Sequence, residues 1–189
     1  HKALEMAFES EQPDILEIIA AELNSNSDPE LINRCAEFFT SIEQHQKAVY
    51  LLARTKHLRE ALQICMDRGV PITEELAEML TPDKSSAAGD EESRVFILTN
   101  LGEVLQQQGD YHTATKKFTQ AGDKVRAMKS LLKSGNTDKI IFFAKSSRQR
   151  EVYIMAANYL QALNWHSDQN ILKHIVIFYS KGQAFDSLA

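Results

Sequence analysis

The feature of this sequence that most constrains its fold is the regular placement of small residues in a polar stretch. Residues 106–127 read QQQGDYHTATKKFTQAGDKVRA. In this stretch the small residues Gly109, Ala114, Ala121 and Gly122 recur at regular places. Small side chains let two helices approach each other, and glycine readily takes the left-handed backbone that ends a helix. The stretch therefore predicts short helices that are closely packed and joined by tight turns.

Composition predicts an all-α chain. Among 189 residues there are only 7 Gly and 4 Pro, while Ala, Leu, Glu, Lys and Gln, which favour helices, are plentiful. No stretch alternates with the period of two that a half-buried strand needs. No apolar run reaches the eighteen residues of a membrane-spanning helix, so direct membrane insertion is not expected.

Apolar spacing and end signals predict about a dozen short helices. The first lies near residues 2–8, and Pro13 begins the second. Ser27 and Glu30 match a capping box for the next helix, in whose first turn Pro29 fits. Pro71 and Thr73 begin another short helix.

Glycines mark several predicted helix ends. Each of four glycines follows an apolar stripe, where a left-handed C-cap favours glycine. They are Gly109, Gly122, Gly135 and Gly182.

The opening stretch can be aligned with the tetratricopeptide repeat, a helical hairpin of about 34 residues with small and large residues at fixed places. Leu101 and Gly102 take the Leu-Gly pair, and Phe118 takes the large position of the second helix. The residues predicted to pack the repeats are Leu101, Gly102, Leu105, Gly109, Tyr111, Ala114, Phe118, Ala121, Ala48 and Ala61. The proline that often closes such a repeat is absent, since Arg126 stands there.

Other spacings depart from a regular array. Ala48 and Ala61 are thirteen residues apart, and Gly109 and Gly135 are twenty-six apart. We therefore expect a right-handed α-solenoid of degenerate tetratricopeptide-like hairpins, in which each hairpin contacts mainly its neighbours. A compact helical bundle is the rival fold, but it would need longer helices than the pattern indicates.

One segment interrupts the helical pattern. Residues 81–93, TPDKSSAAGDEES, are rich in Pro, Ser, Gly and acidic residues. We interpret them as a flexible loop within a single helical-repeat segment spanning residues 1–189, because helical patterning resumes after them. A loop that is phosphorylated or binds a partner is the alternative reading.

The sequence offers no catalytic, metal-binding or cofactor-binding pattern. The six histidines do not pair with Cys, Asp or Glu at metal-ligand spacing, and no glycine-rich phosphate loop or nucleophile elbow is present. Cys35 and Cys65 lie in apolar helical stripes and are interpreted as buried reduced thiols, with a disulfide as the alternative. We therefore predict no cofactor, no metal and no enzymatic activity.

Charge is unevenly distributed along the chain. Residues 1–93 carry 8 Lys and Arg against 19 Asp and Glu, whereas residues 94–150 carry 11 against 4. The candidate interaction surface is the basic set Lys116, Lys117, Lys124, Arg126, Lys129 and Lys133. It indicates either a solvated face or contact with an acidic partner, including a neighbouring subunit. Nucleic acid is not expected, because aromatic residues do not alternate with these basic residues and the whole chain is acidic.

Longer runs of the sequence resemble a known family. Residues 109–165, beginning GDYHTATKKFTQAG and ending YLQALNW, are similar to the helical part of intraflagellar transport proteins that join WD-repeat propellers to degenerate tetratricopeptide repeats. SDPELINRCAEFF and VIFYSKGQAFDSLA fit the same family, and within it the subunits of complex A. The resemblance covers essentially the whole chain and implies a C-terminal-side helical fragment without the propellers.

The resemblance also implies a function. Such proteins are non-catalytic scaffolds of complex A, which supports retrograde ciliary transport, cilium assembly and entry of membrane proteins into cilia. The implied partners are other complex A subunits and, indirectly, the dynein motor and membrane-protein cargo adaptors. The implied locations are the cilium, the ciliary basal body and the cytoplasm.

Two other protein-binding functions and one enzymatic function stay open at this point. A vesicle-coat subunit shares the propeller-plus-solenoid plan, and a co-chaperone-like module would grip an acidic C-terminus. For the latter, Thr99, Asn100 and Glu103 on the inner helix of the best repeat argue against a carboxylate clamp. An enzyme with an unrecognised site is the remaining alternative.

Overall fold

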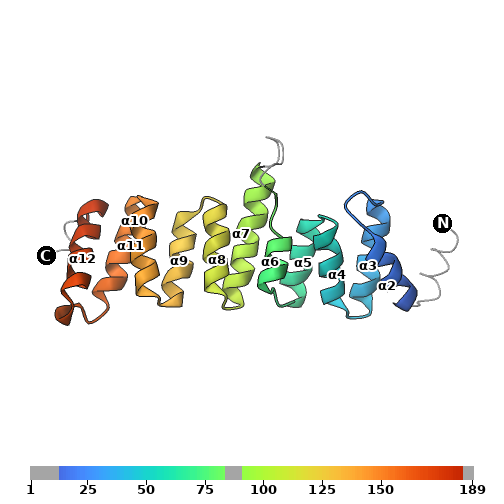
Figure 1. Ribbon diagram of the computed structural model, residues 1–189, viewed down its shortest axis with the longest axis horizontal. Helices are drawn as coiled ribbons and strands as arrows, with labels where there is room; N and C mark the ends of the chain where they lie inside the picture. Colours follow the sequence, from blue (N-terminus) through green and yellow to red (C-terminus); the bar gives the residue numbers. More distant parts are fainter. Residues whose placement is uncertain (1–12, 84–90, 185–189) are drawn as a thin grey trace. The chain divides into compact units, whose positions relative to one another are not determined.

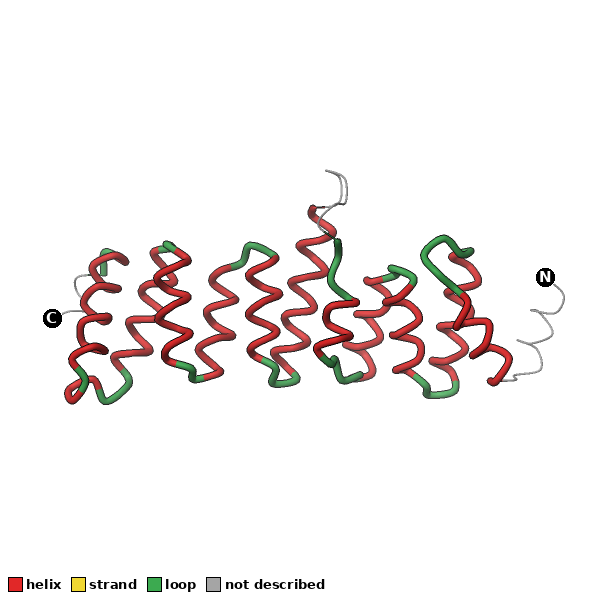
Figure 2. Tube along the Cα trace, in the orientation of Figure 1, coloured by secondary structure: helices red, strands yellow, loops and turns green. Residues whose placement is uncertain are grey.

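The computed structural model describes residues 13–83 and 91–184. Within those ranges the chain forms eleven α-helices and one short 3-10 helix, and no strand (Figures 1 and 2). The all-α prediction is confirmed. The helix predicted near residues 2–8 and most of the predicted loop lie outside the described residues.

The chain divides into two compact units, His1–Leu101 and Gly102–Ala189. The helices of the first unit are α2 (Pro13–Glu22), α3 (Pro29–Ser41), α4 (His45–Arg54), α5 (Leu58–Arg68), α6 (Glu74–Met79) and the first part of α7 (Glu91–Gln107). The helices of the second unit are the rest of α7, α8 (Tyr111–Gln120), α9 (Lys124–Ser134), α10 (Thr137–Ser147), α11 (Arg150–Gln161), η1 (Trp165–Ser167) and α12 (Gln169–Gly182). Since α7 begins at Glu91, the predicted loop is shorter than residues 81–93.

Within each unit, helices pack mainly on their neighbours in the chain. In the first unit α4 packs on both α3 and α5, and in the second unit α9 packs on α8, α10 and α11 (Figure 1). The most extensive pairings are α8 with α9 and α11 with α12. This neighbour-to-neighbour packing is that of a tetratricopeptide-like helical solenoid.

The repeating unit is shorter than the tetratricopeptide standard. Within each unit, residues with a left-handed backbone stand thirteen positions apart, with φ between 53° and 86°; among the described residues only Gln183 departs from this spacing. Those at this spacing are Glu43, Lys56 and Gly69 in the first unit and Gly109, Gly122, Gly135 and Arg148 in the second. Two such steps make a hairpin of twenty-six residues, which explains the spacings that did not fit a 34-residue repeat.

Two turns of the second unit share one hydrogen-bonding scheme. After the left-handed residue, the backbone N–H of Asp110 donates to the carbonyl of Leu105 at 2.9 Å, and that of Asp123 donates to Phe118 at 3.0 Å. This is the Schellman bond that closes a helix. The same aspartates then cap the next helix, since their carboxylates accept from the N–H of Thr113 at 3.0 Å and of Arg126 at 2.9 Å.

The capping aspartate Asp110 has a perturbed ionisation. Burial alone raises the pKa of its carboxyl, but the side-chain and backbone hydrogen bonds from Thr113, with smaller contributions from His112 and Lys116, outweigh burial. The pKa therefore lies below the ordinary Asp value, and the cap is ionised at neutral pH.

Two predicted helix ends are wrong in detail. Asp28, not Ser27, caps α3: its carboxylate accepts from the N–H of Glu30 at 3.0 Å, while the Ser27 hydroxyl accepts from Asn24. Gly182 is the last residue of α12, and Gln183 takes the left-handed conformation instead.

Gly182 serves close packing rather than a turn. A Cβ atom at this position would lie 2.7 Å from Cγ1 of Ile154 on α11, which is closer than two carbon atoms can approach. The glycine therefore allows α12 to approach α11.

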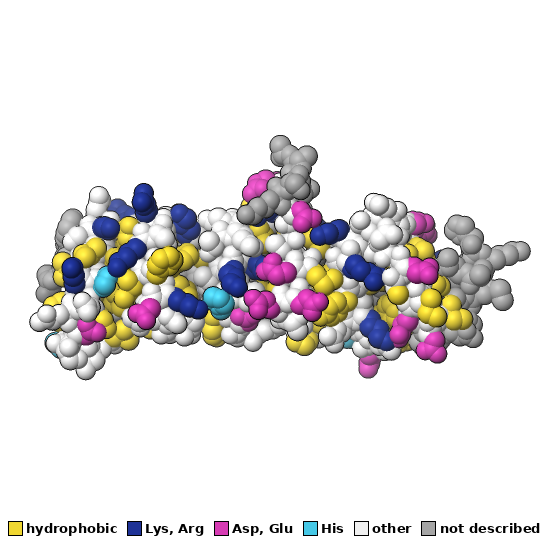
Figure 3. Space-filling view, viewed as in Figure 1, with side chains coloured by type: hydrophobic (Ala, Val, Ile, Leu, Met, Phe, Trp, Pro, Cys, Tyr) yellow, Lys and Arg dark blue, Asp and Glu magenta, His cyan; other side chains and the backbone are white. Residues whose placement is uncertain are grey.

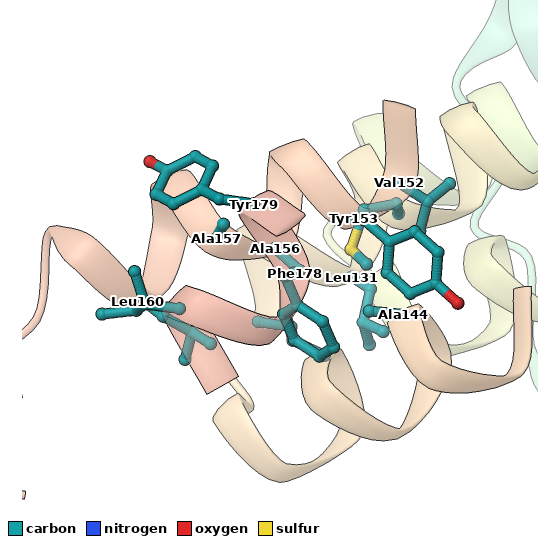
Figure 4. Packing of buried hydrophobic residues seen from close by; sticks show 12 residues of the cluster. Leu131, Ala144, Val152, Tyr153, Ala156, Ala157, Leu160, Phe178 and Tyr179 are labelled. Atoms are coloured by element: carbon teal, nitrogen blue, oxygen red, sulfur yellow. The ribbon is translucent and has the colours of Figure 1, made fainter. Parts of the chain in front are cut away.

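The same register recurs in the core. Leu105, Phe118, Leu131, Ala144 and Ala157, each thirteen residues after the last, are all buried. In the second unit Leu131, Ala144 and Ala157 of this series join residues of α11 and α12 in one apolar cluster, among them Val152, Tyr153, Ala156, Leu160, Phe178 and Tyr179 (Figure 4). Short helices with buried positions at a fixed register thus suffice to build the unit.

The left-handed positions generate a stability prediction. Glu43 is exposed, and its backbone is sterically strained, because an L residue is disfavoured at φ 61°. We expect Glu43→Gly to raise the free energy of unfolding by about 1 kcal/mol, and Gly122→Ala, in a turn with open space, to lower it by a similar amount. Urea unfolding followed by circular dichroism measures both, and equal signs for the two changes would contradict the account.

Candidate protein-interaction groove

A groove of about 540 Å³ lies in the second unit, between the C-terminal part of α7 and α9. The wall from α7 consists of Glu103, Gln106 and Gln107, and the wall from α9 consists of Arg126, Lys129, Leu132 and Lys133. Phe118 of α8 forms the floor and is itself only 1% exposed. The groove thus combines an apolar base with polar and charged walls.

The floor depends on the small residue predicted to bring α7 and α8 together. A Cβ atom on Gly102 would lie 2.8 Å from Cε1 of Phe118, so only glycine lets the α7 backbone lie directly against the ring. Ala114, one turn before Phe118 on α8, is fully buried. The floor of the groove is therefore closely packed.

The wall from α9 is strongly basic. The helix carries Lys124, Arg126, Lys129 and Lys133 and no acidic residue. Nη1 of Arg126 lies 2.5 Å from Oε1 of Glu103 across the groove, and its Nε lies 3.3 Å from the Asp123 carboxylate. On the face that Figure 3 shows, Lys and Arg side chains are interspersed with hydrophobic ones over α9–α12.

Two lysines of this wall have no oppositely charged partner among the described residues. Lys129 and Lys133 are exposed and form no ion pair with any residue in the described part of the chain. They stand four positions apart on one helix face, where like charges repel and destabilise an isolated helix by about 0.2–0.5 kcal/mol. The described fold therefore gains no ion pair from these two charges.

The six basic residues predicted as an interaction surface therefore do not all lie in the groove. Arg126, Lys129 and Lys133 line the groove. Lys124 turns away, since its Nζ donates to the Ser147 carbonyl at 2.9 Å. Lys116 is exposed on α8 and does not line the groove.

The prediction for Lys117 is wrong, because its side chain is fully buried. Thirteen residues before and after it stand Val104 and Ser130, which are also buried. The register thus turns position 117 into the packing between helices, where the long apolar stem of lysine can be accommodated.

Sequence reasoning missed four residues of the groove: Glu103, Gln106, Gln107 and Leu132. The spacing of twenty-six residues contained the signal. Added to Glu103, Gln106 and Gln107, that spacing gives Lys129, Leu132 and Lys133 on the opposite wall. Residues one hairpin apart occupy equivalent places on successive helices of one layer and so face each other across the groove.

The residues predicted to pack the repeats lie in three kinds of place. Seven are buried: Leu101, Gly102, Leu105, Ala114, Phe118, Ala48 and Ala61. Gly109 is exposed in its turn with φ 86°. Tyr111 is half-buried at the start of α8, and Ala121 is half-buried at its C-cap rather than inside a helix contact.

The first unit contains a groove of the same construction with a different charge. It measures about 620 Å³, lies between α3 and α5, and includes Leu52 of α4. Counting from Leu52 as from Phe118, Glu60 stands where the second unit has Arg126, and Gln63 stands where it has Lys129. Glu37, Glu60 and Arg68 line this groove, so its balance of charges differs from that of the α7–α9 groove.

The described residues offer little support for a metal site, a membrane span or a reactive thiol. They contain no group of three His, Cys, Asp or Glu that could hold a metal ion, and none of their helices could cross a membrane. Cys35 and Cys65 are free and buried, and burial raises the pKa of each thiol to about 11, with Arg34 lowering that of Cys35 in part. Both thiols are therefore protonated at neutral pH and poorly reactive.

Comparison with known protein families shows to which family the chain belongs. The family model for the tetratricopeptide-repeat domain of intraflagellar transport proteins 140 and 172 matches residues 1–178 of the chain. The chain belongs to this family. The resemblance to the tetratricopeptide part of intraflagellar transport proteins is thereby confirmed. The chain is a tetratricopeptide-type interaction domain of the intraflagellar transport kind, a family connected with the cilium.

The contact between Gly102 and Phe118 generates a second prediction. We expect Gly102→Ala to lower the free energy of unfolding by about 1 kcal/mol, because the cost of overpacking exceeds the gain in helix propensity. In a Phe118→Leu background the same change should cost less, since the ring edge is gone. A double-mutant cycle by urea unfolding measures this coupling, and strictly additive effects would contradict direct contact.

Proposed function

We propose that this chain is a non-catalytic scaffold segment of an intraflagellar transport complex A subunit similar to subunit 140, and that its α7–α9 groove contacts another subunit. The observation that supports the proposal is the exposed pair Lys129 and Lys133, which has no counter-charge among the described residues and lines a groove with an apolar floor. Membership of the family described above directs the proposal to intraflagellar transport.

The wider role follows from that assignment. As part of complex A, the chain would support retrograde ciliary transport, cilium assembly and the entry of membrane proteins into cilia. Its partners would be other complex A subunits and, through them, the dynein motor and cargo adaptors. It would be found in the cilium, at the basal body and in the cytoplasm.

The physical contribution of the segment would be to hold partners in place. Helical repeats expose long grooves whose walls come from successive helices, and the charges on those walls select a complementary surface and speed its encounter. A basic wall above an apolar floor can combine this selectivity with the burial of an apolar side chain.

Charge reversal in the groove tests the proposal. We expect Lys129→Glu with Lys133→Glu to weaken binding of complex A subunits by tenfold or more, because two attractive contacts become repulsive. Co-purification of the tagged protein with its complex A partners, quantified by mass spectrometry at two salt concentrations, measures the effect.

The matched control is Lys139→Glu with Lys145→Glu, which makes the same charge change at exposed positions of α10 in the same unit. Unchanged recovery of every partner with the groove variant would overturn the groove assignment. Equal loss with both variants would show a general effect of charge instead.

A further inference from the structure

We propose that the groove between α7 and α9 binds an acidic linear segment of a partner protein, and that one carboxylate of this segment replaces Glu103 on Arg126. This inference rests on the proposed function for the identity of the partner and adds the chemistry of the bound segment. Glu103 then determines specificity: while it holds Arg126, it lowers the affinity of the groove for acidic ligands.

The charges on the walls select an acidic ligand. Three cations and a single carboxylate line the groove, and Lys129 and Lys133 are unpaired within the described residues. At the equivalent places of the first-unit groove, Glu60 and Gln63 replace Arg126 and Lys129. The two grooves therefore carry opposite charges at the position of Arg126, which is occupied by Glu60 in the first unit. An acidic segment would accordingly bind the two grooves with different affinities.

The ion pair across the groove is suited to exchange. The side chains of Arg126 and Glu103 are 46% and 45% exposed, and ion pairs at such exposure contribute little to stability, about 0–1 kcal/mol. Replacing one carboxylate by another therefore costs little. Asp123 lies 3.3 Å from Nε of Arg126 and would keep the guanidinium in place when Glu103 leaves.

The groove offers places for both a side chain and the backbone of a linear segment. Its volume of about 540 Å³ lies in the range of about 300–1,000 Å³ typical of pockets that enclose small ligands. Phe118 at the floor and Leu132 on the wall offer an apolar place for one side chain of the segment. Gln106 and Gln107 on the opposite wall carry amides that can both donate to and accept from a peptide backbone.

The experiment measures peptide binding to the whole chain by fluorescence anisotropy. The probe is a labelled twelve-residue peptide of Asp, Glu and Leu with one central Phe, and the control peptide has Asn and Gln in place of the acids. The unaltered chain should prefer the acidic peptide, and Lys129→Glu with Lys133→Glu should abolish that preference.

The decisive variant is Glu103→Gln, for which we expect about fivefold tighter binding of the acidic peptide, the effect of one released ion pair. The matched control is Glu37→Gln, the equivalent change in the first-unit groove, which should leave the affinity unchanged.

Three results would overturn the inference: equal affinity for both peptides, no gain with Glu103→Gln, or lysine-dependent binding of phosphatidylserine vesicles with no binding of the peptide. If the peptide fails while complex A subunits still need Lys129 and Lys133, the proposed function stands and only the linear segment is wrong. If neither probe depends on these lysines, both proposals fail.

Discussion

The close contact between the α7 backbone at Gly102 and the Phe118 ring is the constraint on which the groove depends. It sets the distance between α7 and α8, and the Schellman bond from Asp123 to the Phe118 carbonyl then ends α8 and leads directly into α9. The ring that packs against α7 therefore belongs to the residue that closes the helix. One residue thus links the floor of the groove to the start of its basic wall.

In this arrangement, the residues that maintain the fold are different from those that determine the charge of the surface. The thirteen-residue register reserves fixed positions for buried side chains and for left-handed turns, and it holds even where Glu43, Lys56 or Arg148 must adopt a backbone better suited to glycine. The positions between them are free to vary in charge. Two grooves of the same construction accordingly have walls of different charge.

Much of the fold could be predicted from the sequence, because glycines, capping residues and apolar stripes act locally. The all-α class, the role of Pro29 in the first turn of α3 and the family all followed from local patterns or from resemblance. The exact repeat did not, because three of its left-handed positions lack glycine. Gly182 was misread for a related reason: its role is to admit Ile154 from another helix, which no local pattern reveals.

The site was predictable only in part. The basic character of α9 is visible in the sequence, but which lysines face the groove depends on the register. Lys117 looks like its neighbour Lys116, yet one is buried and the other exposed. Gln106 and Gln107 carry no signal of their own, and Glu103 indicates only the absence of a carboxylate clamp. Their place in the groove follows from the twenty-six-residue hairpin, which brings α7 opposite α9.

Lysine reactivity in the assembled complex would test whether this groove is the contact surface. The full protein, alone and bound to the complex A subunits proposed as its partners, would be labelled with an amine-reactive acetylating reagent and each lysine quantified by mass spectrometry. We expect assembly to protect Lys129 and Lys133 severalfold and to leave Lys139 and Lys145, exposed on α10, unchanged. Unaltered labelling of Lys129 and Lys133, or protection confined to the α10 lysines, would contradict the assignment of the groove.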